Sequence, residues 1–137
     1  MGLILDSSAV IAAERRGDTP AQLVERAINL AGNQEAALSA IGLTELVHGI
    51  YRAESEQRRN RRKAFVDELR AALSVYPYTD ATAMLAGQID GEQTAKGNII
   101  PFTDLLIGAT ALSVGFSVLT VNLRHFKLIP GLKIISL

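Results

Sequence analysis

The segment LILDSS, residues 3–8, decides the class of fold. Residues 3–5 form a short apolar run of the kind that a buried strand uses, and this run ends on Asp6. Ser7 or Ser8 can then begin a helix, because a serine hydroxyl accepts a hydrogen bond from a free backbone N–H at a helix start. A buried strand that leads directly into a helix indicates an α/β protein.

The rest of the chain continues this alternation of short strands and longer helices. Thr19, Pro20 and Gln22 form a capping box with proline at the first helical position. We expect further strands at 36–40, 74–76, 117–120 and 133–136, and helices at 7–15, 20–31, 41–52, 55–73, 80–97 and 103–114. Helices at this spacing predict a parallel sheet of four to five strands with helices on both faces, built as one domain over residues 1–137.

The composition restricts the chemistry that the chain can carry. Its 137 residues are 48% hydrophobic, enough for a substantial core. It has no cysteine and two histidines, which excludes disulfides, thiolate zinc sites, iron–sulfur clusters, a cysteine nucleophile and a three-histidine zinc site. Any metal must therefore be held mainly by oxygen, and oxygen ligands favour Mg²⁺ or Mn²⁺.

The charge and hydropathy patterns bear on partners and location. Fourteen basic residues balance fourteen acidic ones, so the total charge gives no support to nucleic-acid binding, although a local patch still could. The apolar start of the chain has no basic leader, and no stretch approaches the roughly 20 apolar residues of a membrane span. We expect a cytoplasmic protein without a membrane partner.

Asp6 is the first candidate site residue. Sites in open parallel sheets form outside the carboxyl ends of the strands, where Asp6 follows the first strand and Thr120 and Asn122 lie at the end of the fourth. A carboxylate at this place can hold a divalent cation. It can equally cap the helix that follows, and the pattern does not decide between these roles.

Asp104 is the second candidate. The helix around it is apolar on nearly all sides, which predicts burial, so a carboxylate in its first turn either caps the helix or faces a site. Thr103 is an alternative cap. Gly108 and Ala111 share the face of Asp104, and we expect these small residues to leave room for an ion or ligand beside it.

Asp6 and Asp104 can meet only through the fold, because they are far apart in the sequence. If they do meet, repulsion raises the pKa of at least one carboxyl unless a cation compensates. Bare carboxylates favour a hard metal, and such a site predicts phosphodiester hydrolysis. Glu45 is ambiguous: it lies opposite the apolar stripe of its helix, and this pattern alone favours a solvated face.

Four segments together resemble the PIN-domain family, in particular the VapC-type toxins of bacterial toxin–antitoxin pairs. They are LILDSSAVIA (3–12), LTELVHGIYRA (43–53), IPFTDLLIGATALSVG (100–115) and VLTVNLRHFKLIPGLKI (118–134). The resemblance implies a three-layer α/β/α fold and a metal-dependent endoribonuclease that matches its metal-binding acids to Asp6, Glu45 and Asp104. It also implies inhibition by a small VapB-like antitoxin whose C-terminal tail covers the site, and a homodimer.

The chain departs from this family in one place. Many members carry a further acid after the fourth strand, whereas residues 120–126 contain no carboxylate. We therefore expect one metal ion, with Thr120 and Asn122 orienting a water or the hydration shell and Ser8 adding a hydroxyl near the ion. Asp80 and Asp90 are weak substitutes for the missing acid, because their helix is expected to be mostly on the surface.

Other polar residues are candidates for contacts with substrate or antitoxin. His125 occupies a position that is acidic in many members and can contact an RNA phosphate when it is protonated. Arg58, Arg61 and Arg62 continue the apolar stripe of Phe65 along one helix, and this placement suits phosphate steering or antitoxin binding as well as a solvated face.

Two other functions remain open. The missing acid is compatible with a non-catalytic PIN-like binding module. A phosphatase with an aspartyl nucleophile also places an aspartate after its first strand, but that chemistry uses a second aspartate two residues on. Ser8 stands at that position.

Overall fold

Five short parallel strands form the centre of the molecule in a computed structural model, which describes residues 1–137. The strands are β1 (Gly2–Leu5), β2 (Glu35–Ser39), β3 (Ser74–Tyr76), β4 (Ser117–Thr120) and β5 (Ile134–Ser136). Their order across the sheet is β3-β2-β1-β4-β5. β1 therefore occupies the middle, and both of its neighbours pair with it in parallel.

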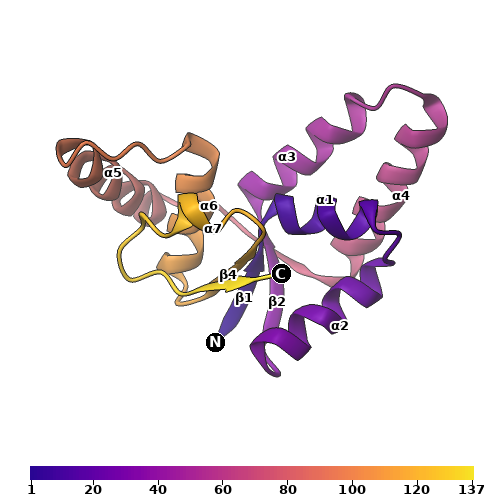
Figure 1. Ribbon diagram of the computed structural model, residues 1–137, viewed down its shortest axis with the longest axis horizontal. Coiled ribbons are helices and arrows are strands. Elements are labelled where there is room, and N and C mark those ends of the chain that lie inside the picture. The colour runs from indigo at the N-terminus through magenta and orange to yellow at the C-terminus, as the bar shows by residue number, and fades with distance from the viewer.

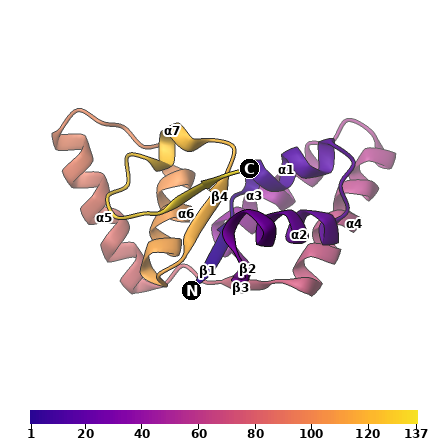
Figure 2. The same cartoon turned by 60° about the horizontal axis from the view of Figure 1, so that its bottom comes forward.

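Helices cover both faces of this sheet. They are α1 (Ser7–Arg15), α2 (Pro20–Ala31), α3 (Ala40–Tyr51), α4 (Glu56–Ala72), α5 (Asp80–Ala95), α6 (Phe102–Ser113) and α7 (Leu123–Phe126). Figure 1 shows α1 to α4 gathered on one side of the strands and α5 to α7 on the other, and Figure 2 shows the same division after rotation. The predicted three-layer α/β/α fold is confirmed.

The central strand shows why two separate cores form. Successive side chains of a strand point to opposite faces of the sheet. Leu3 and Leu5 accordingly pack with residues of α1 to α4, whereas Ile4 packs with residues of α5, α6 and α7. All three side chains are fully buried, so β1 joins the two layers.

The helix starts follow the sequence signals. The capping box of Thr19 and Gln22 is present with Pro20 at the start of α2, and hydroxyl side chains cap the helices that begin after Ser39, Ser55 and Thr79. The expected boundaries agree with the observed ones to within two residues, except that α7 was not predicted. Its four residues are too few to show a helical period. No helix has both the length and the apolar character needed to cross a bilayer.

The register of the sheet brings two candidate residues together. Leu5 in β1 is paired with Leu119 in β4, and the backbone N–H of Asp6 donates to the Leu119 carbonyl at 2.9 Å. Asp6 and Thr120 therefore leave neighbouring strands at the same edge of the sheet. This edge is where an open parallel sheet places its site.

Candidate active site

Asp6 is buried at the carboxyl end of β1 with one oxygen paired and the other free. Its Oδ2 accepts hydrogen bonds from Ser8 Oγ at 2.5 Å and from Thr120 Oγ1 at 2.9 Å. Its Oδ1 is buried and has no hydrogen-bond partner. Asp6 occupies the position before α1, but its side chain makes no capping bond. The helix-cap interpretation of Asp6 is therefore wrong.

The free oxygen of Asp6 is the feature that points to a ligand. Buried polar atoms in proteins are nearly always paired, because an unpaired one loses its bonds to water without replacement. Asp6 Oδ1 is the only buried side-chain nitrogen or oxygen of the chain without a partner. A cation at this oxygen would supply the missing interaction, and carboxylate oxygen is a ligand that Mg²⁺ and Mn²⁺ prefer.

Asp104 lies in the first turn of α6 and faces the same site. The helix begins after Pro101 and has no side-chain cap, so neither Asp104 nor Thr103 caps it. Asp104 Oδ2 lies 2.6 Å from His125 Nδ1, and the residue is 9% exposed. Burial raises the pKa of Asp104 above its usual value, and the charge of Asp6 raises it further, whereas the contact with His125 lowers it. Repulsion from the charge of Asp6 thus contributes to the raised pKa of Asp104.

The space expected beside Asp104 is filled by side chains. A Cβ added at Gly108 would lie 2.3 Å from Ile129 Cδ1 and 3.3 Å from Leu132 Cδ2. Gly108 therefore allows α6 to approach the chain after α7, and the expectation that it leaves room for an ion is wrong.

Glu45 is joined to this region through α1. Ser7 Oγ donates a hydrogen bond to Glu45 Oε1 at 2.8 Å, and Glu45 is half-buried. The helical pattern favours a solvated position for Glu45, and this interpretation is therefore wrong. However, no three His, Asp or Glu side chains are grouped so that they could hold one metal ion. The expected ligand set of Asp6, Glu45 and Asp104 is therefore not assembled into one group.

The residues after β4 complete a network around Asp6. Thr120 is fully buried, and its Oγ1 accepts a hydrogen bond from the backbone N–H of Asn122 at 2.8 Å. The backbone N–H of Val121 donates to Ser8 Oγ at 3.3 Å. Thr120 and Ser8 thus hydrogen-bond to Asp6 directly, while Asn122 joins this network through its backbone N–H. Their expected roles toward a water or a metal ion stay predictions. Asp80 and Asp90 are exposed on α5 and join no metal-binding group.

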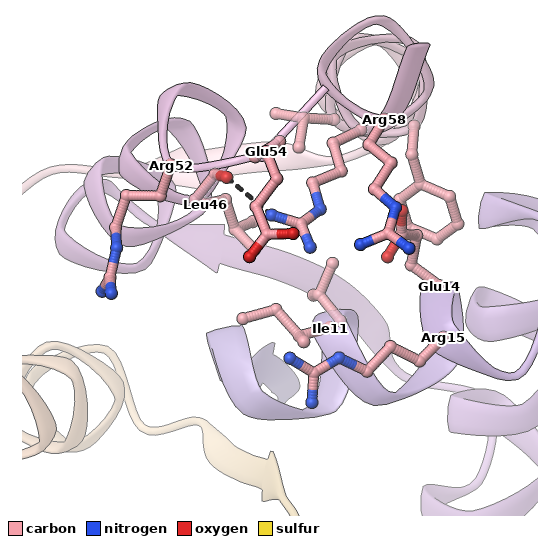
Figure 3. A pocket seen from close by; sticks show the side chains of 13 residues that line it. Ile11, Glu14, Arg15, Leu46, Arg52, Glu54 and Arg58 are labelled. Carbon is pink, nitrogen blue, oxygen red and sulfur yellow. Dashed lines mark hydrogen bonds between the residues drawn. The ribbon is translucent and has the colours of Figure 1, made fainter. Parts of the chain in front are cut away.

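A cavity of about 460 Å³ lies between α1, α3 and α4. Its walls carry apolar side chains such as Val10, Ile11 and Leu46, and Arg58 and Arg62 line it from α4. Figure 3 shows Arg58 extending from α4 toward α1. Arg62 also donates to the Gly49 carbonyl at 2.8 Å, near the end of α3.

The helical spacing correctly predicts part of the cavity wall, but two contacts in the site have no signal in the sequence. Arg58 and Arg62 share a cavity with the apolar stripe, as the helical spacing predicts, whereas Arg61 is exposed outside it. The bond from Ser7 to Glu45 and the contact of His125 with Asp104 were not expected. No spacing rule relates these pairs, because each joins two elements that are remote in the sequence.

Comparison with known proteins agrees with the geometry. The family model described as PIN domain matches residues 3–132. The ribonuclease VapC1 of Rickettsia felis is 32% identical over 136 residues, which cover 99% of this chain and 96% of that protein. The tRNA(fMet)-specific endonuclease VapC of Salmonella typhimurium is 37% identical over 97 residues, or 71% of each chain.

Solved structures show the same likeness in three dimensions. The VapBC2 complex of Rickettsia felis, bound to a DNA fragment from its promoter, contains a chain with a TM-score of 0.86 and 25% identity that covers 100% of this chain and 99% of that one. DNA-bound VapBC from Salmonella typhimurium gives a TM-score of 0.83 and 29% identity, with coverage of 99% and 98%. The fold, the sequence and the ribonuclease class of these relatives therefore agree with the family resemblance of the four sequence segments. The chain belongs to the PIN domain family and, within it, to the VapC ribonucleases.

Proposed function

We propose that this ribonuclease is a cytoplasmic toxin that cleaves RNA internally with Mg²⁺ or Mn²⁺ held by Asp6 and Asp104, and that a small VapB-like antitoxin neutralises it. One observation carries the metal site: Asp6 Oδ1 is buried without a partner. The pKa of nearby Asp104 is raised partly by the charge of Asp6. A cation between these carboxylates would relieve both unfavourable features.

The donor set suits a hard cation that keeps much of its water. Mg²⁺ is commonly held by one or two carboxylates together with waters and substrate phosphate, so two aspartates are enough. When bound, the ion neutralises charge on the phosphodiester and promotes ionisation of an attacking water. The absence of a third grouped acid favours one ion over two.

The surrounding residues hold and orient these groups. Ser8 and Thr120 occupy Asp6 Oδ2 and so direct Oδ1 toward the ligand. Glu45 is fixed by Ser7 at the edge of the site, where its carboxylate is suited to orient a water and accept its proton. Asn122 shapes the same edge through its backbone bond to Thr120, and its side chain is free to orient water.

The test of the proposed function is metal-dependent cleavage of RNA by the purified chain. We expect internal cleavage with Mg²⁺ or Mn²⁺, loss of cleavage in EDTA and recovery when the metal is restored. A small phosphomonoester should remain intact, because the site lacks the second aspartate of a phosphatase. Absence of both cleavage and Mn²⁺ binding would instead support the non-catalytic binding module.

We further propose that the cavity between α1, α3 and α4 receives the antitoxin. It begins one turn from the Ser7–Glu45 bond, since Val10 and Leu46 line it. Its walls are partly apolar, and its four arginines outnumber its two glutamates, Glu14 and Glu54. This lining suits an amphipathic segment that carries acidic side chains. The solved relatives are VapBC complexes. A segment bound here could continue over the acidic site, while exposed Arg61 and half-buried His125 remain available for RNA phosphates.

Ile11 offers a direct test of this cavity, because it lines the wall and is 36% exposed. We expect Ile11→Asp to weaken antitoxin binding by at least about tenfold, which corresponds to roughly 1.4 kcal/mol, through lost apolar contact and charge burial. Binding is measured by calorimetry with the antitoxin encoded beside the gene. Exposed Leu30→Asp, on α2 and outside the cavity, is the matched control and should leave antitoxin binding unchanged. Equal affinity of Ile11→Asp and the unchanged protein would exclude this cavity.

A homodimer is the remaining part of the proposal. Met84 of α5 and Ile99, in the loop between α5 and α6, are 79% and 83% exposed. Met84 is near the start of α5 and Ile99 lies beyond its end, so the two side chains flank this helix. Exposed apolar side chains are one mark of a contact surface. We propose that a second copy of the chain covers this part of the molecule.

A further inference from the structure

The contact between His125 and Asp104 joins two parts of the site that the sequence keeps apart. His125 lies on the four-residue helix α7, and its Nδ1 is 2.6 Å from Asp104 Oδ2. The side chains are 29% and 13% exposed, so water is largely excluded from the Asp104 side of the pair. The carboxylate of Asp104 has no other hydrogen-bond partner within the protein.

The chemistry of the pair determines which atom carries the hydrogen. An ionised carboxylate accepts hydrogen bonds but cannot donate one. When Asp104 is ionised, as a metal ligand must be, His125 Nδ1 therefore carries a hydrogen and donates it to Oδ2. This holds for the imidazolium and for the neutral ring with its hydrogen on Nδ1. The bond is charge-assisted and directional.

The same arrangement occurs at both aspartates. Asp6 has its Oδ2 held by two hydroxyls and its Oδ1 free, and Asp104 has its Oδ2 held by an imidazole with no protein donor at Oδ1. A carboxylate whose one oxygen is fixed by a protein donor can present the other to a ligand in a defined direction. Partners of this kind orient metal ligands and strengthen metal binding.

Phe126, the residue after His125, anchors α7 in the core. Phe126 is fully buried in the core that α6 forms with the sheet, and its Cδ1 lies 3.5 Å from a Cβ built on Gly108. α7 is thus packed against the helix that carries Asp104. Because Phe126 fixes α7, the preceding side chain is held against Asp104 with little freedom.

We propose that His125 is a positioning residue: it holds Asp104 Oδ2 so that Oδ1 is presented to a divalent cation shared with Asp6. This inference rests on the proposed metal site. In this role His125 acts through Asp104 and not as a metal ligand. Its contribution is to the affinity for metal.

The experiment measures Mn²⁺ affinity by calorimetry, without RNA, for the full chain and its variants. We expect His125→Ala and His125→Leu to weaken Mn²⁺ binding by about 10- to 100-fold, the usual effect of removing such a partner. His125→Asn should retain most of the affinity, because its amide N–H can donate from nearly the position of Nδ1. Exposed Lys127→Ala, immediately after the same helix, is the control and should bind as the unchanged protein does.

The variants separate the competing roles of His125. Equal loss in the asparagine, alanine and leucine variants would show a direct ligand and overturn the positioning role. Unchanged affinity in the alanine and leucine variants would show that His125 has no role toward the metal. If the unchanged protein itself bound no Mn²⁺, the proposed metal site would fail and the inference with it. Circular dichroism verifies folding, and the leucine variant keeps the test valid if alanine destabilises α7.

Discussion

Replacing Asp6 or Asp104 with asparagine is expected to reduce metal-dependent RNA cleavage by about a thousandfold, the upper range for loss of one electrostatic contact in an active site. Asparagine preserves the shape of each side chain and removes its negative charge. The change therefore acts on the cation while it leaves the packing of β1 and α6 intact. Cleavage is measured with purified protein, a defined RNA and saturating Mg²⁺.

Both variants are expected to lose RNA cleavage for the same reason, although Asp6 and Asp104 lie on different elements of the fold. Asp6 provides a buried oxygen that no protein group satisfies, and Asp104 provides the neighbouring charge. Exposed Asp90→Asn is the matched control, since it removes a carboxylate from the surface of α5. Full cleavage by both site variants, with contaminating ribonuclease excluded, would contradict the proposed mechanism.

Unfolding experiments distinguish loss of metal from loss of fold. The pKa of Asp104 is raised, chiefly by burial, so the folded protein favours the protonated carboxyl. This contribution to stability is present below the unfolded-state pKa of about 3.9 and is lost as pH rises through the folded-state pKa. In EDTA at neutral pH, Asp104→Asn should therefore unfold at a higher temperature than the unchanged protein. A lower melting temperature would mean that its inactivity reflects damaged structure.

Replacing Phe126 with alanine is expected to lower the free energy of unfolding by about 3–5 kcal/mol, the usual cost of removing a fully buried phenylalanine. Phe126 is 0% exposed and belongs to the core on the α5–α6 side of the sheet. The cavity left behind would also loosen α7, which carries His125. Urea denaturation followed by circular dichroism measures the loss, and weaker Mn²⁺ binding in the folded fraction should accompany it.

An exposed aromatic residue provides the comparison for this variant. Tyr51 is 68% exposed at the end of α3, and Tyr51→Ala should change the free energy of unfolding by no more than about 0.5 kcal/mol. A similar small effect of Phe126→Ala would show that α7 does not depend on its aromatic anchor. In that case the firm placement of His125 against Asp104 would need another cause.

The fold was largely predictable because its signals are local. Alternating apolar strands and capped helices are visible in short windows, and the expected boundaries agree closely with the observed ones. α7 could not be predicted from the sequence, because a helix of a single turn is too short to show a hydrophobic period. Gly108 was misread because a small residue leaves space only if no neighbour fills it, and Ile129 does so from a distant segment.

The site was predictable only in part. Asp6 and Asp104 are recognisable in the sequence because carboxylates are unusual beside buried apolar segments, and the charge of Asp6 contributes to the raised pKa of Asp104. Glu45 depended on the family resemblance, since its helical pattern suggested a solvated face. Its bond to Ser7 links α1 with α3, and no pattern within either helix contains that contact.

By itself, the sequence determined the layers of the fold, the absence of sulfur ligands and thus the preference for a hard cation, because these follow from composition and from neighbours along the chain. Only the tertiary structure decided that Asp6 keeps one buried oxygen free, that His125 contacts Asp104 and that Asp6, Glu45 and Asp104 do not form one group. Each of these depends on the direction of a side chain across a contact between remote elements. Such directions are set by packing and by competition among hydrogen-bond partners, and both exist only after the chain has folded.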